Sequence, residues 1–123
     1  MLSTLSSACM ADVSADKRQE VTHLLEFVKT SNCIVNRNGD DYKGKDAAKH
    51  ISKKYKYYRD DIKTSEDFIL LSATKSTMSG KMYKVKCPGK RELTTQDWLL
   101  GELKVFRSKG DLDAEYKTKR THQ

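Results

Sequence analysis

The fold of this chain is decided by the stretch Arg37-Asn38-Gly39-Asp40-Asp41-Tyr42 and by the lysine-rich segment that follows it, from about Gly44 to Ile62. Asparagine and glycine tolerate the positive φ angles that a type I′ turn requires, so Asn38-Gly39 predicts a tight hairpin. The β-prone run Cys33-Ile34-Val35 would supply its first strand, and Asp41-Tyr42 would return as the second.

The segment from Gly44 to Ile62 has the pattern of an amphipathic helix. Apolar side chains recur within an arc of about 100°, and they are Ala47, Ala48, Ile51, Tyr55, Tyr58 and Ile62. Lysines lie on the opposite side, at Lys45, Lys49, Lys53, Lys56 and Lys63. Between Lys43 and Lys63, eight basic residues stand against three acidic ones, a net of +5 within a chain of net charge +7. We expect the apolar side to face a sheet and the lysines to face water.

Three further helices and one further strand are predicted around this block. The first helix runs from about Asp16 to Thr30 and has an apolar face at three- and four-residue spacing. Thr64 with Asp67, and Thr94 with Asp97, have capping-box spacing and would each open a helix. Alternation from Met82 to Cys87 predicts a half-buried strand. The sequence therefore predicts an α+β fold, with about four helices packed on an antiparallel sheet of two or three strands.

The 123 residues predict a single domain over 16–108. Residues 1–15 are interpreted as part of a signal peptide or as a disordered N-terminus, because Val13-Ser14-Ala15 fits a small-residue cleavage site. Ser7-Ala8-Cys9 hints at a lipid-modified cysteine. Residues 109–123 are expected to be a flexible polar tail. No segment reaches the roughly 18 apolar residues of a membrane span.

Cys33 opens the first predicted strand and Cys87 closes the last. If these strands are neighbours, a disulfide is sterically possible, and an exported location would permit it. The alternative is a pair of small buried thiols. Neither cysteine belongs to a C-x-x-C motif, so the sequence predicts no zinc site and no thioredoxin-like chemistry.

Several blocks, in order, resemble the YfeK-like family of small exported bacterial proteins of unknown function. They are Arg37-Asn38-Gly39, Ala47-Ala48-Lys49-His50-Ile51 with Lys54, Ile62-Lys63-Thr64-Ser65-Glu66-Asp67-Phe68-Ile69, Ser79-Gly80-Lys81-Met82-Tyr83, Val85-Lys86-Cys87-Pro88-Gly89 and Trp98-Leu99. Met82 stands where the family pattern would have a proline. The resemblance implies export to the periplasm or cell envelope, and it implies no activity.

The best candidate site is the polar loop from Lys75 to Lys81, with Ser76, Thr77, Ser79 and Lys81. Its backbone N–H groups could bind an anion, or its hydroxyls could simply cap the preceding helix. Arg37 and Asn38 could present a guanidinium at the hairpin tip, or form a turn with an arginine paired to Asp40. The lysine face (Lys45, Lys49, Lys53 and Lys56) could bind an anionic partner, or be a solvated surface.

No catalytic motif occurs, and the three histidines have no metal-ligand partner at helical spacing. We therefore predict no metal and no cofactor, and favour a non-enzymatic binding module. Its expected partner is an acidic protein, a glycan or a lipid headgroup. Two alternatives stay open: a small hydrolase or transferase that uses the Ser/Thr/Lys loop, and a basic nucleic-acid-binding protein, which weak aromatic interleaving disfavours.

Overall fold

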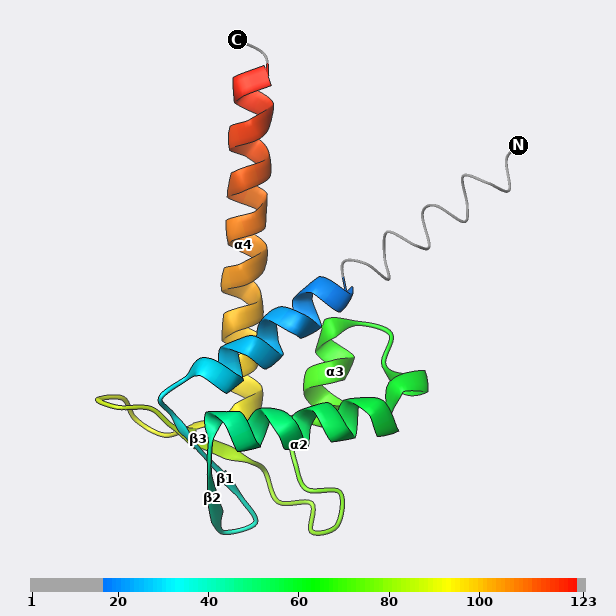
Figure 1. The fold of residues 1–123 in the computed structure, drawn as a ribbon, viewed down its shortest axis with the longest axis vertical. Helices are drawn as coiled ribbons and strands as arrows, with labels where there is room; N and C mark the ends of the chain where they lie inside the picture. The colour runs from blue at the N-terminus through cyan, green and yellow to red at the C-terminus, as the bar shows by residue number, and fades with distance from the viewer. Residues whose placement is uncertain (1–16, 122–123) are drawn as a thin grey trace.

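The computed structural model describes residues 17–121, with side chains described for residues 17–116. Within this part the chain is α+β, as predicted (Figure 1). A helix covers residues 17–30. The elements that follow are β1 (Ile34–Arg37), β2 (Asp40–Lys43), α2 (Gly44–Tyr57), a 3₁₀ turn (Arg59–Asp61), α3 (Ser65–Ser72), β3 (Lys84–Lys86), β4 (Leu93–Thr94) and α4 (Thr95–Thr121). The predicted caps are present: Thr64 and Asp67 form a capping box, and Thr94 accepts from the Asp97 amide at 3.1 Å.

The sheet is antiparallel, with strand order β2-β1-β3-β4. Val35 of β1 lies opposite Tyr42 on one side and Val85 on the other, so β1 is a central strand. The predicted hairpin is confirmed, with positive φ angles at Asn38 (55°) and Gly39 (88°). The prediction of two or three strands was wrong, because a fourth strand, β4, pairs with β3. β4 has only two residues, which is too short for an alternating pattern to be visible in a sequence.

A disulfide joins Cys33 and Cys87. The β1–β3 register pairs Ile34 with Lys86, so the two cysteines stand opposite each other one step beyond the last ladder pair. Their Cα atoms are 4.2 Å apart. The predicted disulfide is therefore confirmed, and the alternative of two buried free thiols is not.

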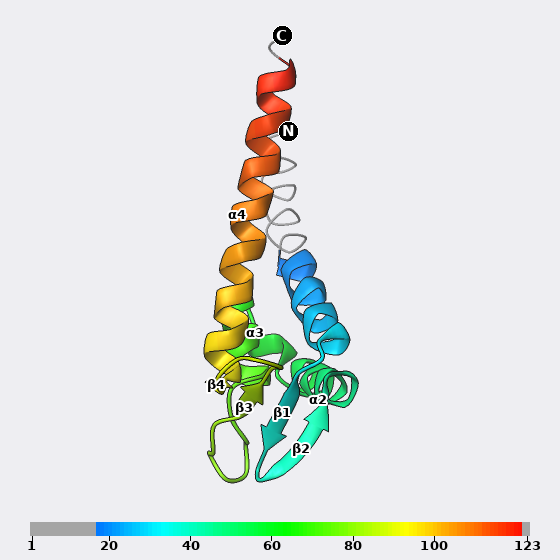
Figure 2. The ribbon, with the colours of Figure 1, turned by 90° about the vertical axis from the view of Figure 1, so that its left-hand side faces the viewer.

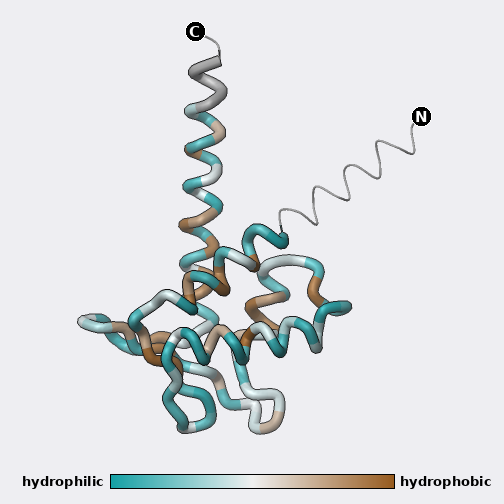
Figure 3. The backbone as a smooth tube through the Cα atoms, viewed as in Figure 1, coloured by the Kyte–Doolittle hydropathy of each residue, from teal (hydrophilic) through white to brown (hydrophobic). Residues whose placement is uncertain are grey.

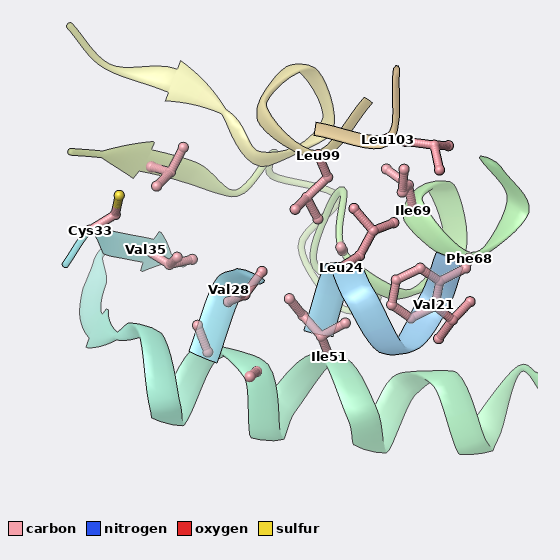
Figure 4. Packing of buried hydrophobic residues seen from close by; sticks show 14 of the residues in the cluster. Val21, Leu24, Val28, Cys33, Val35, Ile51, Phe68, Ile69, Leu99 and Leu103 are labelled. Carbon is pink, nitrogen blue, oxygen red and sulfur yellow. The ribbon is translucent and has the colours of Figure 1, made fainter. Parts of the chain in front are cut away.

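The core lies between the sheet, α2, α3, the helix over residues 17–30 and the first turns of α4 (Figure 4). In the helix over residues 17–30, Leu24 and Val28 point into it, and Val35 of β1 and Ile51 of α2 meet them. Leu99 closes it from α4. α3 is nearly all-round apolar in sequence, and the hydropathy-coloured trace shows it among the more hydrophobic segments (Figure 3).

Helix α2 packs as predicted but ends earlier. Its apolar residues Ala47, Ala48 and Ile51 are buried, and the predicted lysine face is exposed at Lys45, Lys49, Lys53, Lys56 and Lys63. The helix ends at Tyr57, and the chain tightens into the 3₁₀ turn, where the Asp61 amide donates to the Tyr58 carbonyl at 2.9 Å. Ile62, the predicted last residue of the apolar face, is buried beyond that turn.

Helix α4 is longer than predicted and projects from the rest of the molecule (Figures 1 and 2). Residues 109–121 of the predicted polar tail are helical in the structure. We expected a flexible tail because residues 109–123 contain few apolar side chains. The segment nevertheless has no proline and is rich in residues with good helix propensity. A single glycine, Gly110, costs about 1 kcal/mol and does not end the helix. The flexibility of residues 109–123 stays a prediction, and residues 1–15 lie outside the described part of the chain.

Candidate functional site

The hairpin tip and the polar loop, which are far apart in sequence, are bound to each other. Asn38 donates from Nδ2 to the Oγ of Ser76 at 3.1 Å, and its Oδ1 accepts from the Oγ of Ser79 at 2.6 Å. β1 pairs with β3, and this pairing places the hairpin tip beside the loop that leads into β3. Asn38, Ser76 and Ser79 were all candidate site residues, and the structure brings them into one cluster.

The backbone N–H groups of the loop are largely used within the loop. The Ser76 amide donates to the Lys81 carbonyl and the Gly80 amide to the Ser76 carbonyl, both at 2.9 Å. The Ser79 and Lys81 amides donate to the hydroxyls of Ser76 and Ser79, at 3.2 and 3.3 Å. These four donors are therefore not directed at solvent, and any affinity of the loop for anions would depend on its lysine side chains.

The loop is also attached to α2. Lys54 donates from Nζ to the Lys75 carbonyl at 2.7 Å, and the hydroxyls of Tyr58 and Thr77 are 3.1 Å apart. Lys54 was not in our candidate set, although it belongs to a block that resembles the YfeK-like family. Its position between the apolar and lysine sides of the helix was the signal that could have identified it.

Two open hollows flank the Tyr58–Thr77 contact. One, of about 340 Å³, is lined by Lys53, Lys54, Tyr57, Tyr58 and Thr77. The other, of about 240 Å³, is lined by Lys54, Tyr58, Leu70, Leu71, Lys75, Ser76, Thr77 and Gly80. The lining residues include lysines, tyrosines and leucines but no histidine and no acid. We define the basic surface as Lys49, Lys53 and Lys56 of α2, Lys75 and Lys81 of the loop, and these two hollows.

The predicted lysine face meets the loop at one residue. Lys53 lines the larger hollow, whereas Lys45, Lys49 and Lys56 are exposed on α2 without lining either hollow. Lys81 is exposed beside Ser79 in the loop. The sequence therefore predicted the exposure of these lysines correctly, but the contact between α2 and the loop depends on Lys54 and Tyr58.

Arg37 makes contacts with two aromatic rings that the sequence analysis did not foresee. Its guanidinium lies over the rings of Tyr42 and Tyr83, 5.2 Å from each centroid. The residue is partly buried, and its Nε is a buried atom without a hydrogen-bond partner in the described part of the chain. Among the described residues Arg37 forms no ion pair with Asp40, and its ring contacts hold the guanidinium against Tyr42 and Tyr83. A part of Arg37 in anion binding stays a prediction.

Arg37 also lines a small, partly enclosed cavity. It measures about 10 Å³ and is lined by Val35, Arg37, Ala47, His50, Ile51, Lys54, Ser72, Ala73, Tyr83 and Thr95. Ser72 is fully buried, and its Oγ is likewise without a hydrogen-bond partner in the described residues. A space of this size holds about one water molecule, so it admits no organic substrate. Burial, and next the positive charges of Arg37 and Lys53, lower the pKa of His50 beside it.

The described residues contain no group of three or more histidine, cysteine, aspartate or glutamate side chains that could hold a metal ion. No described helix has the length and apolar character needed to cross a bilayer. His23 is in contact with Glu102, with its Nε2 2.7 Å from the carboxylate, and it stacks on Phe106. This contact joins the helix over residues 17–30 to α4.

Arg107, near the C-terminal end of the predicted domain, forms the largest ion-pair cluster in the described residues. Arg107 of α4 bonds Glu20 at 2.8 Å and Glu66 at 2.7 Å, and Glu20 also accepts from Ser65. The guanidinium lowers the pKa of both glutamates, and they raise the pKa of Arg107. The cluster fastens α4 to α3 and to the helix over residues 17–30. Our sequence analysis did not identify it, because its members are up to 87 residues apart.

Residues 15–107 match a protein family described as a family of unknown function, DUF5329. The chain belongs to this family. No curated protein and no solved structure matches the chain. The membership leaves the function open, and the resemblance to YfeK-like proteins, with the export that it implies, stays a prediction.

Proposed function

We propose that this protein is an exported, non-enzymatic module that binds an anionic partner through its basic surface. The observation that carries the proposal is the attachment of the lysine-bearing helix to the polar loop. Lys54 and Tyr58 fix α2 against the loop, and Lys53 and Lys75 then line two neighbouring open hollows that contain no acid. A fixed surface rich in lysines attracts oppositely charged partners and accelerates their encounter.

Export is supported by the bond between Cys33 and Cys87, since structural disulfides persist in oxidising compartments. It is tested in the native cell, by blocking free thiols during lysis and counting those on this protein. We expect the Cys33–Cys87 bond to be present before lysis, and the protein to fractionate with the periplasm or envelope. Reduced cysteines together with a cytosolic fraction would contradict export.

The absence of an acid or a histidine from both hollows at the loop supports a binding role over a catalytic one. A hydrolase that used Ser76 or Thr77 would need a base within hydrogen-bond reach. In the structure the Ser76 hydroxyl is bonded to Asn38, and the Thr77 hydroxyl to Tyr58.

Binding is tested with a charge-reversal triple, Lys49→Glu, Lys53→Glu and Lys56→Glu, on immobilised heparin as a generic polyanion. The matched control is Lys90→Glu, Arg91→Glu and Lys104→Glu, which changes the net charge equally at exposed positions outside the basic surface. We expect the first triple to elute at clearly lower salt than the control. Equal elution of the two triples would show that only net charge matters, and it would overturn the proposal.

A further inference from the structure

We propose that the anionic partner is a lipid surface, on which the basic surface docks with Met78 and Tyr57 inserted among the headgroups. This inference rests on the proposed function and adds the class of partner. It comes from apolar side chains that stand exposed among the lysines.

The apolar part of this surface is unusually open to solvent. Met78, at the outer end of the loop, is 97% exposed; Tyr57, at the end of α2, is 82% exposed, and Leu70 is 50% exposed. Thr77 precedes Met78 and lines both hollows, one with Tyr57 and the other with Leu70. Tyr57 and Leu70 thus line two hollows that share Thr77, and Met78 is the next residue along the loop; we refer to these three exposed residues as the patch. In Figure 3 the loop between α3 and β3 turns pale brown at its outer end, whereas the neighbouring hairpin tip is hydrophilic.

Lysines surround this patch. Lys53 shares a hollow with Tyr57, and Lys75 shares the other with Leu70. Lys56 and Lys81 are exposed next to Tyr57 and Gly80 in sequence. Each basic residue close to an anionic membrane strengthens binding by about fivefold. Four lysines thus supply the attraction, and the apolar side chains supply insertion, the combination that peripheral membrane proteins use.

The exposure of Met78 favours a lipid surface over the other classes of anionic partner. An acidic peptide or glycan would pair with the lysines and leave Met78 in water, where its exposure would serve no binding role. A lipid interface accepts both the ammonium groups and the apolar side chains. Asn38 also holds the loop in place through its hydrogen bonds to Ser76 and Ser79. Docking on a membrane would therefore cost little loop entropy.

The test is co-sedimentation with vesicles of phosphatidylcholine alone and of phosphatidylcholine mixed with phosphatidylglycerol. We expect binding to the mixed vesicles only, with a steep loss on added salt. The double variant Met78→Ser with Tyr57→Ser should bind the mixed vesicles at least tenfold more weakly, because the inserted apolar area is gone. The control Leu112→Ser changes a residue that is 64% exposed on α4, and it should bind like wild type.

The outcomes separate this inference from the proposed function. Unchanged vesicle binding by the double variant, or no vesicle binding by the wild-type protein, would overturn the lipid inference. If heparin elution still depended on Lys49, Lys53 and Lys56 in that case, the proposed function would stand, and binding to poly-glutamate beads would identify an acidic protein as the partner class. Heparin elution should not change in Met78→Ser alone, because this substitution removes no positive charge and Met78 lines neither hollow.

Discussion

Asn38 donates a hydrogen bond to Ser76, 38 residues further along the chain, and so joins the tip of the β1–β2 hairpin to the loop that carries Met78. The same amide accepts from Ser79. One side chain therefore fixes the relation between the hairpin and the candidate binding loop. Asparagine suits this position twice, since it also tolerates the left-handed backbone that the turn requires.

Replacing Asn38 should loosen the loop. Asn38→Gly keeps the left-handed backbone accessible while removing both hydrogen bonds, and we expect it to cost about 1–2 kcal/mol of unfolding free energy. The measurement is urea denaturation of a double-mutant cycle with Ser76→Ala and Ser79→Ala. The cost of Asn38→Gly should shrink in the background that lacks both serines. Full additivity would show that the bonds contribute nothing.

The Arg107 cluster should make the protein sensitive to acid. Arg107 lowers the pKa of Glu20 and Glu66, so the folded state binds fewer protons than the unfolded state. The stabilisation is therefore present above the ordinary glutamate pKa of 4.5, and it is lost as the pH falls through the lowered values. Arg107→Gln should cost about 1 kcal/mol near pH 7, because exposed ion pairs are weak individually.

The decisive observation for this cluster is the acid part of the curve. The variant Arg107→Gln should lose less stability than wild type between pH 5 and about pH 3. Lys104→Gln, an exposed change on the same helix, serves as the control and should follow the wild-type curve. Parallel curves for wild type and Arg107→Gln would contradict a role of the cluster in acid sensitivity.

His50 should titrate below its usual pKa of 6.5, since burial, then Arg37 and Lys53, disfavour the protonated ring. Its contribution to stability is complete above pH 6.5 and declines as the pH falls through the lowered pKa. An NMR titration of the imidazole C2 proton measures this value directly. Lys53→Gln should raise the His50 pKa relative to wild type, and a lower or unchanged value would be the contrary result.

The cavity between Arg37 and Ser72 should contain one ordered water. Arg37 and Ser72 both line a space of about 10 Å³, and each has a buried polar atom without a partner in the described residues. Buried water commonly satisfies such groups. A high-resolution crystal structure should show it within hydrogen-bond distance of Arg37 Nε and Ser72 Oγ. Ser72→Ala should cost about 1 kcal/mol by removing one of its partners, while the exposed change Ser108→Ala should cost nothing. An empty cavity would refute the prediction.

Much of the fold could be predicted because its signals are local. Asn38-Gly39 specified the hairpin, Thr64 with Asp67 specified the start of α3, and the lysine spacing of α2 specified which side faces water. β4 escaped prediction because two residues carry no period. The helical end of α4 escaped because helix propensity can act without an apolar face.

The sequence indicated several residues of the candidate site, but it did not indicate which of them are in contact. Ser76 and Asn38 were both candidates, yet only the pairing of β1 with β3 reveals that they touch. The contacts of Arg37 with Tyr42 and Tyr83 escaped prediction, because position in a turn says nothing about which rings lie next to the guanidinium. Lys54 and Arg107 act through partners 21 or more residues away, and periodicity carries no information at that range.

The Cys33–Cys87 bond closes the chain into a covalent ring of residues 33–87. The ring contains the hairpin, α2, α3 and the polar loop, so every residue of the basic surface belongs to it. The helix over residues 17–30 precedes the ring in the chain, and α4 follows it. A protease that cuts the exposed loop once would therefore release no fragment of this surface. The nicked protein would migrate as one species until a thiol reductant opened the ring, and the surface would survive damage that would separate an unbonded chain into two pieces.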